Sequence, residues 1–185
     1  MSLRTTKGHN VKKLLSLGLA AIAACALWVP YAGAHATVNL LLGQSLTSAT
    51  ATWFLRVPNE RPNKSTFKVT MSVPPEAQSS IAVRQMPGWT TTLTRQDTGQ
   101  KDGDGNPIYN ITAITWQAQK GNLIQPGMYQ SFEFRFKAPP TPASLCFPTV
   151  QVYNGAAKSM ATETVNWTGP AGSATPASCV NITAS

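Results

Sequence analysis

Short runs rich in β-branched and aromatic residues recur after residue 36 at intervals of about ten residues, and Pro, Gly, Asn or Asp bounds most of them. The stretch 129–136 alternates apolar and polar residues, which sets Phe132, Phe134 and Phe136 on one face. No helical period longer than a turn or two follows residue 34. This pattern predicts an all-β, immunoglobulin-like β-sandwich.

Ten strands are expected from these runs: Thr37–Leu42, Ala49–Val57, Thr66–Val73, Ile81–Gln85, Thr90–Gln96, Tyr109–Gln117, Ser131–Ala138, Thr149–Asn154, Thr162–Trp167 and Val180–Ala184. The segment 102–107, with sequence Asp-Gly-Asp-Gly-Asn-Pro, falls between two of them and predicts a hairpin tip. Its alternating oxygens also match the start of an EF-hand calcium loop. However, Pro107 occupies the position of the required glycine, and Ala113 that of the bidentate acid.

The first 34 residues follow the order of a secretory signal peptide. A basic region (Arg4, Lys7, Lys12, Lys13) precedes an apolar run from Leu14 to Leu27, and Ala32-Gly33-Ala34 supplies small residues for cleavage. We therefore expect cleavage between Ala34 and His35, which leaves residues 35–185 as one domain in the periplasm or medium of a bacterium. The apolar run is shorter than the roughly 20 residues of a bilayer span, so no permanent membrane anchor is expected.

Two other processing sites stay open. Ile22-Ala23-Ala24-Cys25 fits the loose pattern of a lipoprotein signal, in which cleavage precedes a lipidated Cys25. Cleavage after Ala32 would leave Gly33-Ala34-His35, an amino-terminal motif that chelates Cu(II) and Ni(II) with a different geometry.

The chain carries a net charge of +8, from 15 Lys and Arg against seven Asp and Glu. Four of the basic residues belong to the predicted signal, so the remaining 11 leave a mature charge of +4. They are scattered singly, with no basic run and no interleaved aromatic residues, and nucleic acid is not an expected partner.

Cys146 and Cys179 are the two cysteines that remain after residue 34. An even pair in an oxidising compartment predicts a disulfide. A metal site built on these two thiolates is the alternative, but neither a Cys-x-x-Cys spacing nor a nearby histidine accompanies them.

His35 is the one histidine of the mature chain, and we expect no enzyme from this inventory. A Gly-x-Ser-x-Gly nucleophile motif and a phosphate-binding glycine-rich loop are both missing from the sequence. Cleavage before His35 would give one residue both a free amine and an imidazole, which can close a ring around a single metal ion. Two nitrogens in one plane suit Cu(II). A terminal histidine without any role is the alternative reading of the same residue.

Several segments, in this order, resemble the YcnI-like family of exported copper-binding domains. They are His35-Ala36-Thr37-Val38, Arg56-Val57-Pro58-Asn59-Glu60, Met86-Pro87-Gly88-Trp89, Ile114-Thr115-Trp116, Ile124-Gln125-Pro126-Gly127, Phe147-Pro148-Thr149-Val150-Gln151 and Asn166-Trp167-Thr168-Gly169-Pro170. The resemblance covers most of the chain from His35 to Trp167.

This resemblance implies a β-sandwich that binds one Cu(II) per chain in a mono-histidine brace. His35 would give two nitrogens, Glu60 a carboxylate oxygen, and Trp167 an aromatic wall beside the metal. The alternatives are that Glu60 is a surface acid paired with Arg56 or Arg61, and that Trp167 belongs to the core. The other tryptophans of the mature chain are expected in the core: Trp53, Trp89 and Trp116.

The implied function is copper buffering or delivery, with a membrane copper transporter or another copper chaperone as the partner. The chain departs from the familiar family pattern in carrying the Cys146 and Cys179 pair around Trp167, and the membrane tail seen on many relatives is not expected here. Two other functions stay open: a structural or adhesive sandwich without a metal, and an oxidative histidine-brace enzyme. The latter needs a second histidine, which residues 36–185 lack.

Overall fold

The structure is a computed structural model that describes residues 35–155 and 162–185. The predicted signal peptide, its cleavage site and the alternative at Cys25 lie outside these residues. Within the two described ranges, no helix has both the length and the apolar character that crossing a bilayer requires.

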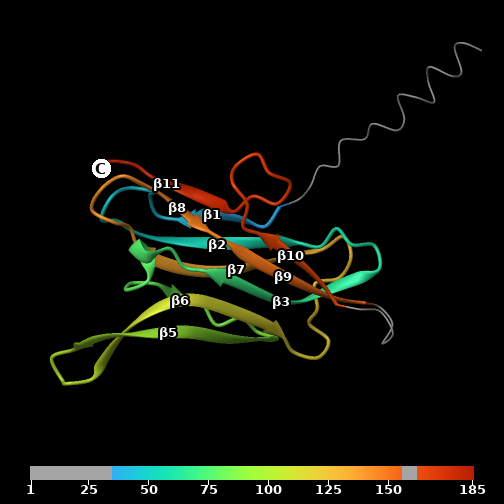
Figure 1. The fold of residues 1–185 in the computed structure, drawn as a ribbon, viewed down its shortest axis with the longest axis horizontal. Coiled ribbons are helices and arrows are strands. Elements are labelled where there is room, and N and C mark those ends of the chain that lie inside the picture. Colours follow the sequence, from blue (N-terminus) through green and yellow to red (C-terminus); the bar gives the residue numbers. More distant parts are fainter. Residues whose placement is uncertain (1–34, 156–161) are drawn as a thin grey trace, which may run out of the picture. The chain divides into compact units, whose positions relative to one another are not determined.

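Eleven strands and one short 3₁₀ helix make up the described chain (Figure 1). The strands are β1 (Thr37–Leu42), β2 (Thr50–Pro58), β3 (Lys64–Ser72), β4 (Ala82–Val83), β5 (Trp89–Lys101), β6 (Pro107–Ala118), β7 (Tyr129–Lys137), β8 (Ala143–Phe147), β9 (Thr149–Gly155), β10 (Glu163–Trp167) and β11 (Ser178–Ile182). The 3₁₀ helix, η1, spans Pro75–Ala77.

Two antiparallel sheets form the sandwich, one in the order β1-β2-β7-β4 and the other in the order β10-β9-β3-β6-β5. A third, two-stranded sheet pairs β11 with β8. The all-β, immunoglobulin-like sandwich that the sequence predicts is therefore the fold of the chain.

The core is an aromatic layer built on β7. Phe132, Phe134 and Phe136 all point inward and are at most 1% exposed, as the alternating pattern predicts. Phe132 stacks on Trp116 of β6, with ring centroids 4.8 Å apart, and Phe134 lies 5.5 Å from Phe147 of β8. These contacts join one sheet to the strands that face it.

All three tryptophans expected in the core are found there. Trp53 stacks on Phe136 at 5.5 Å, Trp89 meets the edge of Phe132 at 5.0 Å, and Trp116 is fully buried. Each large ring removes about 150–250 Å² from water, so this layer dominates the hydrophobic stabilisation of the sandwich.

The expected strands differ from the observed ones where strand pairing sets the length of a strand. The sequence prediction missed β8, a five-residue strand between prolines that is completed by its pairing with β11. Expected strand 81–85 shrinks to the two residues of β4, whereas expected strand 90–96 extends to Lys101 because β5 continues its ladder with β6.

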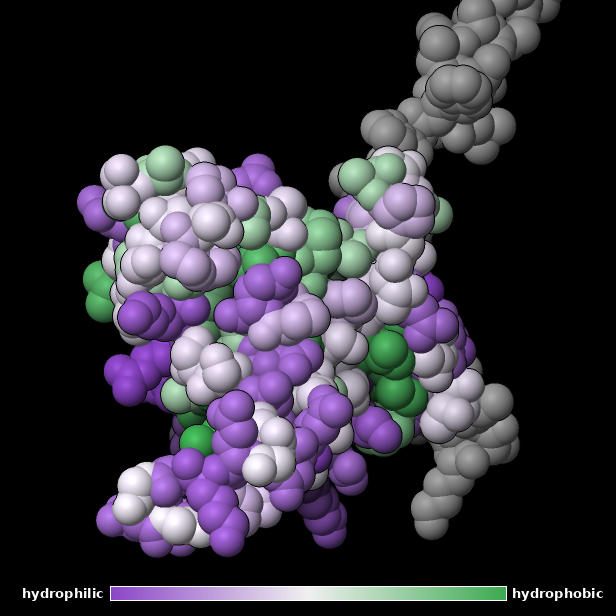
Figure 2. Space-filling view, turned by 60° about the vertical axis from the view of Figure 1, so that its left-hand side comes forward, coloured by the Kyte–Doolittle hydropathy of each residue, from purple (hydrophilic) through white to green (hydrophobic). Residues whose placement is uncertain are grey.

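The β5–β6 hairpin ends in the turn that the sequence predicts (Figure 1). The Asp102 N–H donates to the Asn106 carbonyl at 2.9 Å, and the Asp102 carboxylate accepts from the backbone N–H groups of Asp104 and Asn106. These hydrogen bonds hold the pKa of Asp102 below its usual value. The lower part of the molecule, which this hairpin forms, is predominantly hydrophilic (Figure 2).

Cys146 and Cys179 form the predicted disulfide and are direct partners in the β8–β11 ladder. The bond ties β11 to β8, and the hydroxyl of Ser178 in β11 accepts from the Val38 N–H of β1 at 2.7 Å. The disulfide is therefore connected, through one strand, to the beginning of β1.

The inward phenylalanines of β7 allow a direct test of the core. Phe134→Ala is expected to lower the free energy of unfolding by about 3–5 kcal/mol, because it removes a ring and leaves a cavity between the sheets. The neighbouring exposed side chain gives the matched control, and Arg135→Ala is expected to change stability by about 0.5 kcal/mol or less. Urea unfolding measures both, and equal losses would contradict the assignment of the inward face.

Candidate functional site

His35 lies immediately before β1 and is half-buried. Ala36, the next residue, is 1% exposed and fixes the chain against the core. Thr37 pairs with Arg56 of β2, and this antiparallel register, continued by two residues, brings position 35 level with Pro58. The start of β1 is thus held beside the end of β2, where the segment that carries Glu60 begins.

The imidazole of His35 contacts the indole of Trp167. Their ring centroids are 5.3 Å apart and the planes make an angle of 63°, an edge-to-face contact. Trp167 is the last residue of β10, pairs with Thr149 of β9, and is 7% exposed. It is both a core aromatic and the direct neighbour of His35, so the two alternatives from the sequence are not exclusive.

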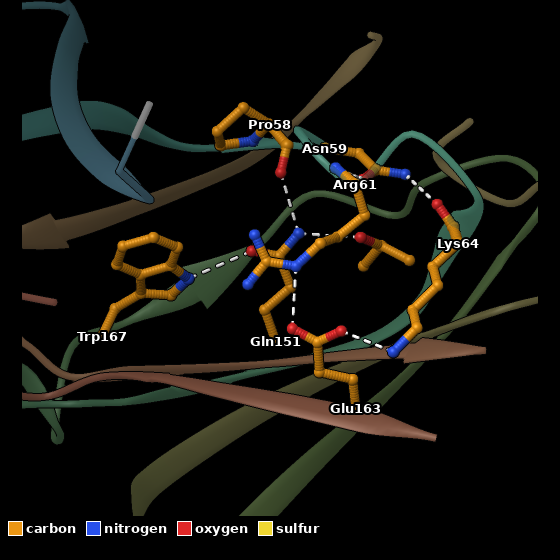
Figure 3. A network of polar contacts seen from close by, with 8 residues as sticks. Pro58, Asn59, Arg61, Lys64, Gln151, Glu163 and Trp167 are labelled. Atoms are coloured by element: carbon orange, nitrogen blue, oxygen red, sulfur yellow. Dashed lines mark hydrogen bonds and ion pairs between the residues drawn. The ribbon is translucent and has the colours of Figure 1, made fainter. Parts of the chain in front are cut away.

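Gln151 of β9 holds Trp167 in this orientation (Figure 3). Its side-chain oxygen accepts from the indole Nε1 at 3.0 Å, and its Nε2 donates to the Pro58 carbonyl at 2.8 Å and to the Thr66 hydroxyl at 2.7 Å. The indole can only donate and the Pro58 carbonyl can only accept, so the amide orientation is determined. Gln151 is fully buried and joins Trp167 to the chain two residues before Glu60.

Asn59 fixes the turn that follows β2. Its side chain, 2% exposed, donates to the carbonyls of Lys64 and Ile124 at 2.7 and 2.8 Å and accepts from the Arg61 N–H at 2.9 Å. Its backbone also bonds to Met128 and Gly127. Glu60 lies between Asn59 and Arg61, so its backbone position is set on both sides by this buried amide.

Glu60 is half-buried, and its charge reaches Tyr153 of β9. Burial raises the pKa of the Tyr153 hydroxyl to about 12, with smaller increases from the charges of Glu163 and Glu60, while Arg61 and a hydrogen bond with Thr66 oppose the shift. Tyr153 therefore stays protonated at physiological pH. Because Thr66 also bonds Gln151, Tyr153 belongs to the same polar network as Trp167.

Glu163 of β10 forms ion pairs at the turn between β2 and β3. It accepts from Arg61 Nε at 2.7 Å and from Lys64 Nζ at 2.6 Å (Figure 3). The hydrogen bond from Lys64, followed by that from Arg61, holds the pKa of Glu163 below its usual value. Arg61 thus forms an ion pair with Glu163, and Arg56 lies over the rings of Phe54 and Tyr129.

The structure brings His35 into contact with Trp167, and it connects Trp167 to the Glu60 segment through Gln151 and Pro58. In the described residues, no group of three or more His, Cys, Asp or Glu side chains is arranged to hold a metal ion. The metal ligands that the resemblance implies include only two such side chains, one histidine and one carboxylate. The remaining nitrogen would come from the backbone.

Sequence reasoning assigned no role to Gln151, Asn59 or Glu163. Gln151 and Asn59 stand inside segments that carry the family resemblance, which was the available signal. Glu163 stands in none of them. A buried amide that bonds three distant groups has no pattern along the chain, because its partners are assembled by strand pairing.

The amide of Gln151 can be tested by its removal. Gln151→Leu keeps the approximate volume but leaves the buried indole N–H of Trp167 without its partner and removes one hydrogen bond from the Thr66 hydroxyl, and it is expected to cost about 2–4 kcal/mol of unfolding free energy. Trp167→Phe removes the other end of the bond. The double variant is expected to cost less than the sum of the single variants by about 1 kcal/mol or more. Strict additivity in urea unfolding, with the exposed Gln117→Leu as control, would argue against the bond.

The Glu163 clamp predicts a pH dependence. Because the folded pKa is lowered, its stabilisation is present above the unfolded value near 4.5 and is lost as pH falls through the folded value. Glu163→Gln is expected to lower stability at pH 7 by about 1 kcal/mol, a deficit that shrinks below pH 4.5. Chemical unfolding between pH 3 and pH 7 measures this, with exposed Glu76→Gln as control. A deficit that stays constant down to pH 3 would rule out the charged clamp.

Comparison with known proteins agrees with this architecture. The profile of a domain of unknown function, DUF1775, matches residues 35–182. The chain is 28% identical over 152 residues to the copper-binding protein CutI of Bacillus subtilis (strain 168), which covers 82% of this chain and 65% of CutI. The chain thus spans less than two thirds of the length of that relative.

Among solved structures, an uncharacterized protein from Nocardia farcinica with an immunoglobulin-like fold superposes with a TM-score of 0.63. It is 24% identical, and the match covers 80% of this chain and 98% of that one. At this identity the likeness shows the fold alone. The profile match, which begins at His35 and ends at the last residue of β11, decides the family: the chain belongs to the DUF1775 family, the YcnI-like family that its motifs resemble.

Proposed function

We propose that the processed protein binds one Cu(II) ion through the amine and imidazole nitrogens of His35, with Glu60 as an oxygen ligand and Trp167 as the adjoining wall. The observation that carries this proposal is the contact between His35 and Trp167, because Trp167 is fixed by the same amide that holds the chain before Glu60. The copper binding of CutI, a relative over most of the chain, supports the choice of metal.

The chemistry of the three groups fits copper(II). Amine and imidazole nitrogens are ligands that Cu(II) prefers, and a carboxylate adds an oxygen and offsets positive charge. The Trp167 N–H is already donated to Gln151, so the indole can offer only its ring to the metal side, where it restricts the approach of water.

Removal of residues 1–34 is a required step of this proposal. In the full chain the nitrogen of His35 is part of a peptide bond with Ala34, and it becomes an amine only on cleavage between these two residues. We accordingly place the working protein outside the cytoplasm, in the periplasm or the medium, with residues 35–185 as its one domain.

We infer a binding role and not a catalytic one. An oxidative histidine-brace site uses a second histidine, and residues 36–185 contain none. Copper homeostasis is the role that fits: the protein would buffer Cu(II) or deliver it, and a membrane copper transporter or another copper chaperone would be its partner class.

A copper titration of the exported protein tests this proposal after intact-mass measurement has located its first residue. A chain that begins at His35 is expected to take up one equivalent of Cu(II) and to lose Trp167 fluorescence. One extra glycine before His35 should weaken binding about 100-fold or more, beyond the 10–100-fold cost of outer-shell changes. Glu60→Gln should weaken it about tenfold or more, with Glu76→Gln as a control that binds normally. Equal affinity with and without the extra glycine would refute the brace.

A further inference from the structure

The outer face of the β1-β2-β7-β4 sheet carries a groove that the copper site does not use. Its floor is a block of four outward side chains, with Phe54 opposite Glu133 and Arg56 opposite Ser131 in the β2–β7 register. The space above them is about 400 Å³, within the range of ligand sites in proteins.

Apolar side chains line two sides of the groove, and the polar side chains of Arg84 and Gln85 also line it. Leu41 of the edge strand β1 lines one side. Met86 and Pro87, which follow β4, line the other. Leu41 belongs to a run of three consecutive exposed leucines: Leu40 is 39% exposed, Leu41 52% and Leu42 73%. Consecutive exposed apolar residues are costly in water unless a partner covers them.

Arg56 supplies a preset positive charge at the floor. Its guanidinium lies 5.1 Å from the centroid of Phe54 and 4.9 Å from that of Tyr129, an arrangement that orders the side chain without neutralising it. In the part of the chain that the structure describes, no carboxylate pairs with Arg56. The acid of the floor, Glu133, is already bonded to Arg84 at 2.7 Å.

We propose that this groove docks an extended segment of a partner protein in which a carboxylate side chain is flanked by apolar residues. The carboxylate would pair with Arg56, and the apolar side chains would cover Leu41, Phe54 and Met86. A second copy of this chain fits poorly, since the chain is positively charged. The half-exposed wall at Leu41 makes the groove shallow, whereas small ligands are 70–90% buried in their sites, as a general rule.

Arg56, in the floor of the groove, lies near the end of the sheet that carries His35. Arg56 pairs with Thr37, two residues after His35, and strands rise about 3.3 Å per residue. A partner protein whose segment is bound over Arg56 would therefore lie within about 10 Å of the end of β1 that follows His35. Docking does not itself require copper, so this proposal stands apart from the metal site.

The test uses the metal-free exported protein, labelled with ¹⁵N, and an acetylated, amidated pentapeptide of sequence Ala-Leu-Glu-Leu-Ala. Amide shifts are expected at Leu41, Phe54 and Arg56 as the peptide is added. The matched peptide with Gln in place of Glu should bind about tenfold more weakly, the scale of one charge-assisted hydrogen bond.

The variant Arg56→Gln should bind the acidic peptide more weakly by the same factor, about tenfold. Arg95→Gln, which makes the same charge change at an exposed position on β5, should leave binding unaltered. No shifts in the groove, or equal binding of the two peptides, would overturn the proposal. A failure of copper binding in the separate titration would leave it intact.

Discussion

The inward row of phenylalanines on β7 is the constraint on which the rest of the molecule depends. Phe132, Phe134 and Phe136 make aromatic contacts that reach β2, β5, β6 and β8, so one strand holds both sheets together. Because side chains alternate between the two faces of a strand, these rings also determine which side chains of β7 face outward. If these rings face the core, Ser131 and Glu133 must face outward, and they form the floor of the groove.

Polar groups at one end of the sandwich are satisfied inside the protein by two buried amides. Gln151 joins β9, the end of β2 and Trp167, while Asn59 closes the turn that follows β2. A buried amide with all its partners present is rigid, because losing any one of them leaves a desolvated group. This rigidity would serve the proposed copper site, because His35 and Glu60 come from segments with no regular structure of their own.

One edge strand connects the proposed copper ligands with the proposed groove. β1 is common to both, because His35 precedes it and Leu41 lies near its end. The disulfide of β8 and β11 supports this strand through the bond from Val38 to Ser178. The cysteine pair thus has a structural explanation, which does not depend on either proposed binding role.

The sequence by itself determined the fold class, the aromatic face of β7, the hairpin at 102–107 and the cysteine pair, because each depends on local alternation, turn chemistry or composition. It singled out His35 by position, and the family resemblance pointed to Glu60 and Trp167. Only the tertiary structure decided that His35 touches Trp167, that Gln151 fixes this indole and that Glu163 clamps the turn. The tertiary structure also determines β8, because this strand forms by pairing with β11. The physical reason is that these contacts join residues up to about 130 positions apart, and strand register, which sets them, leaves no periodic trace along the chain.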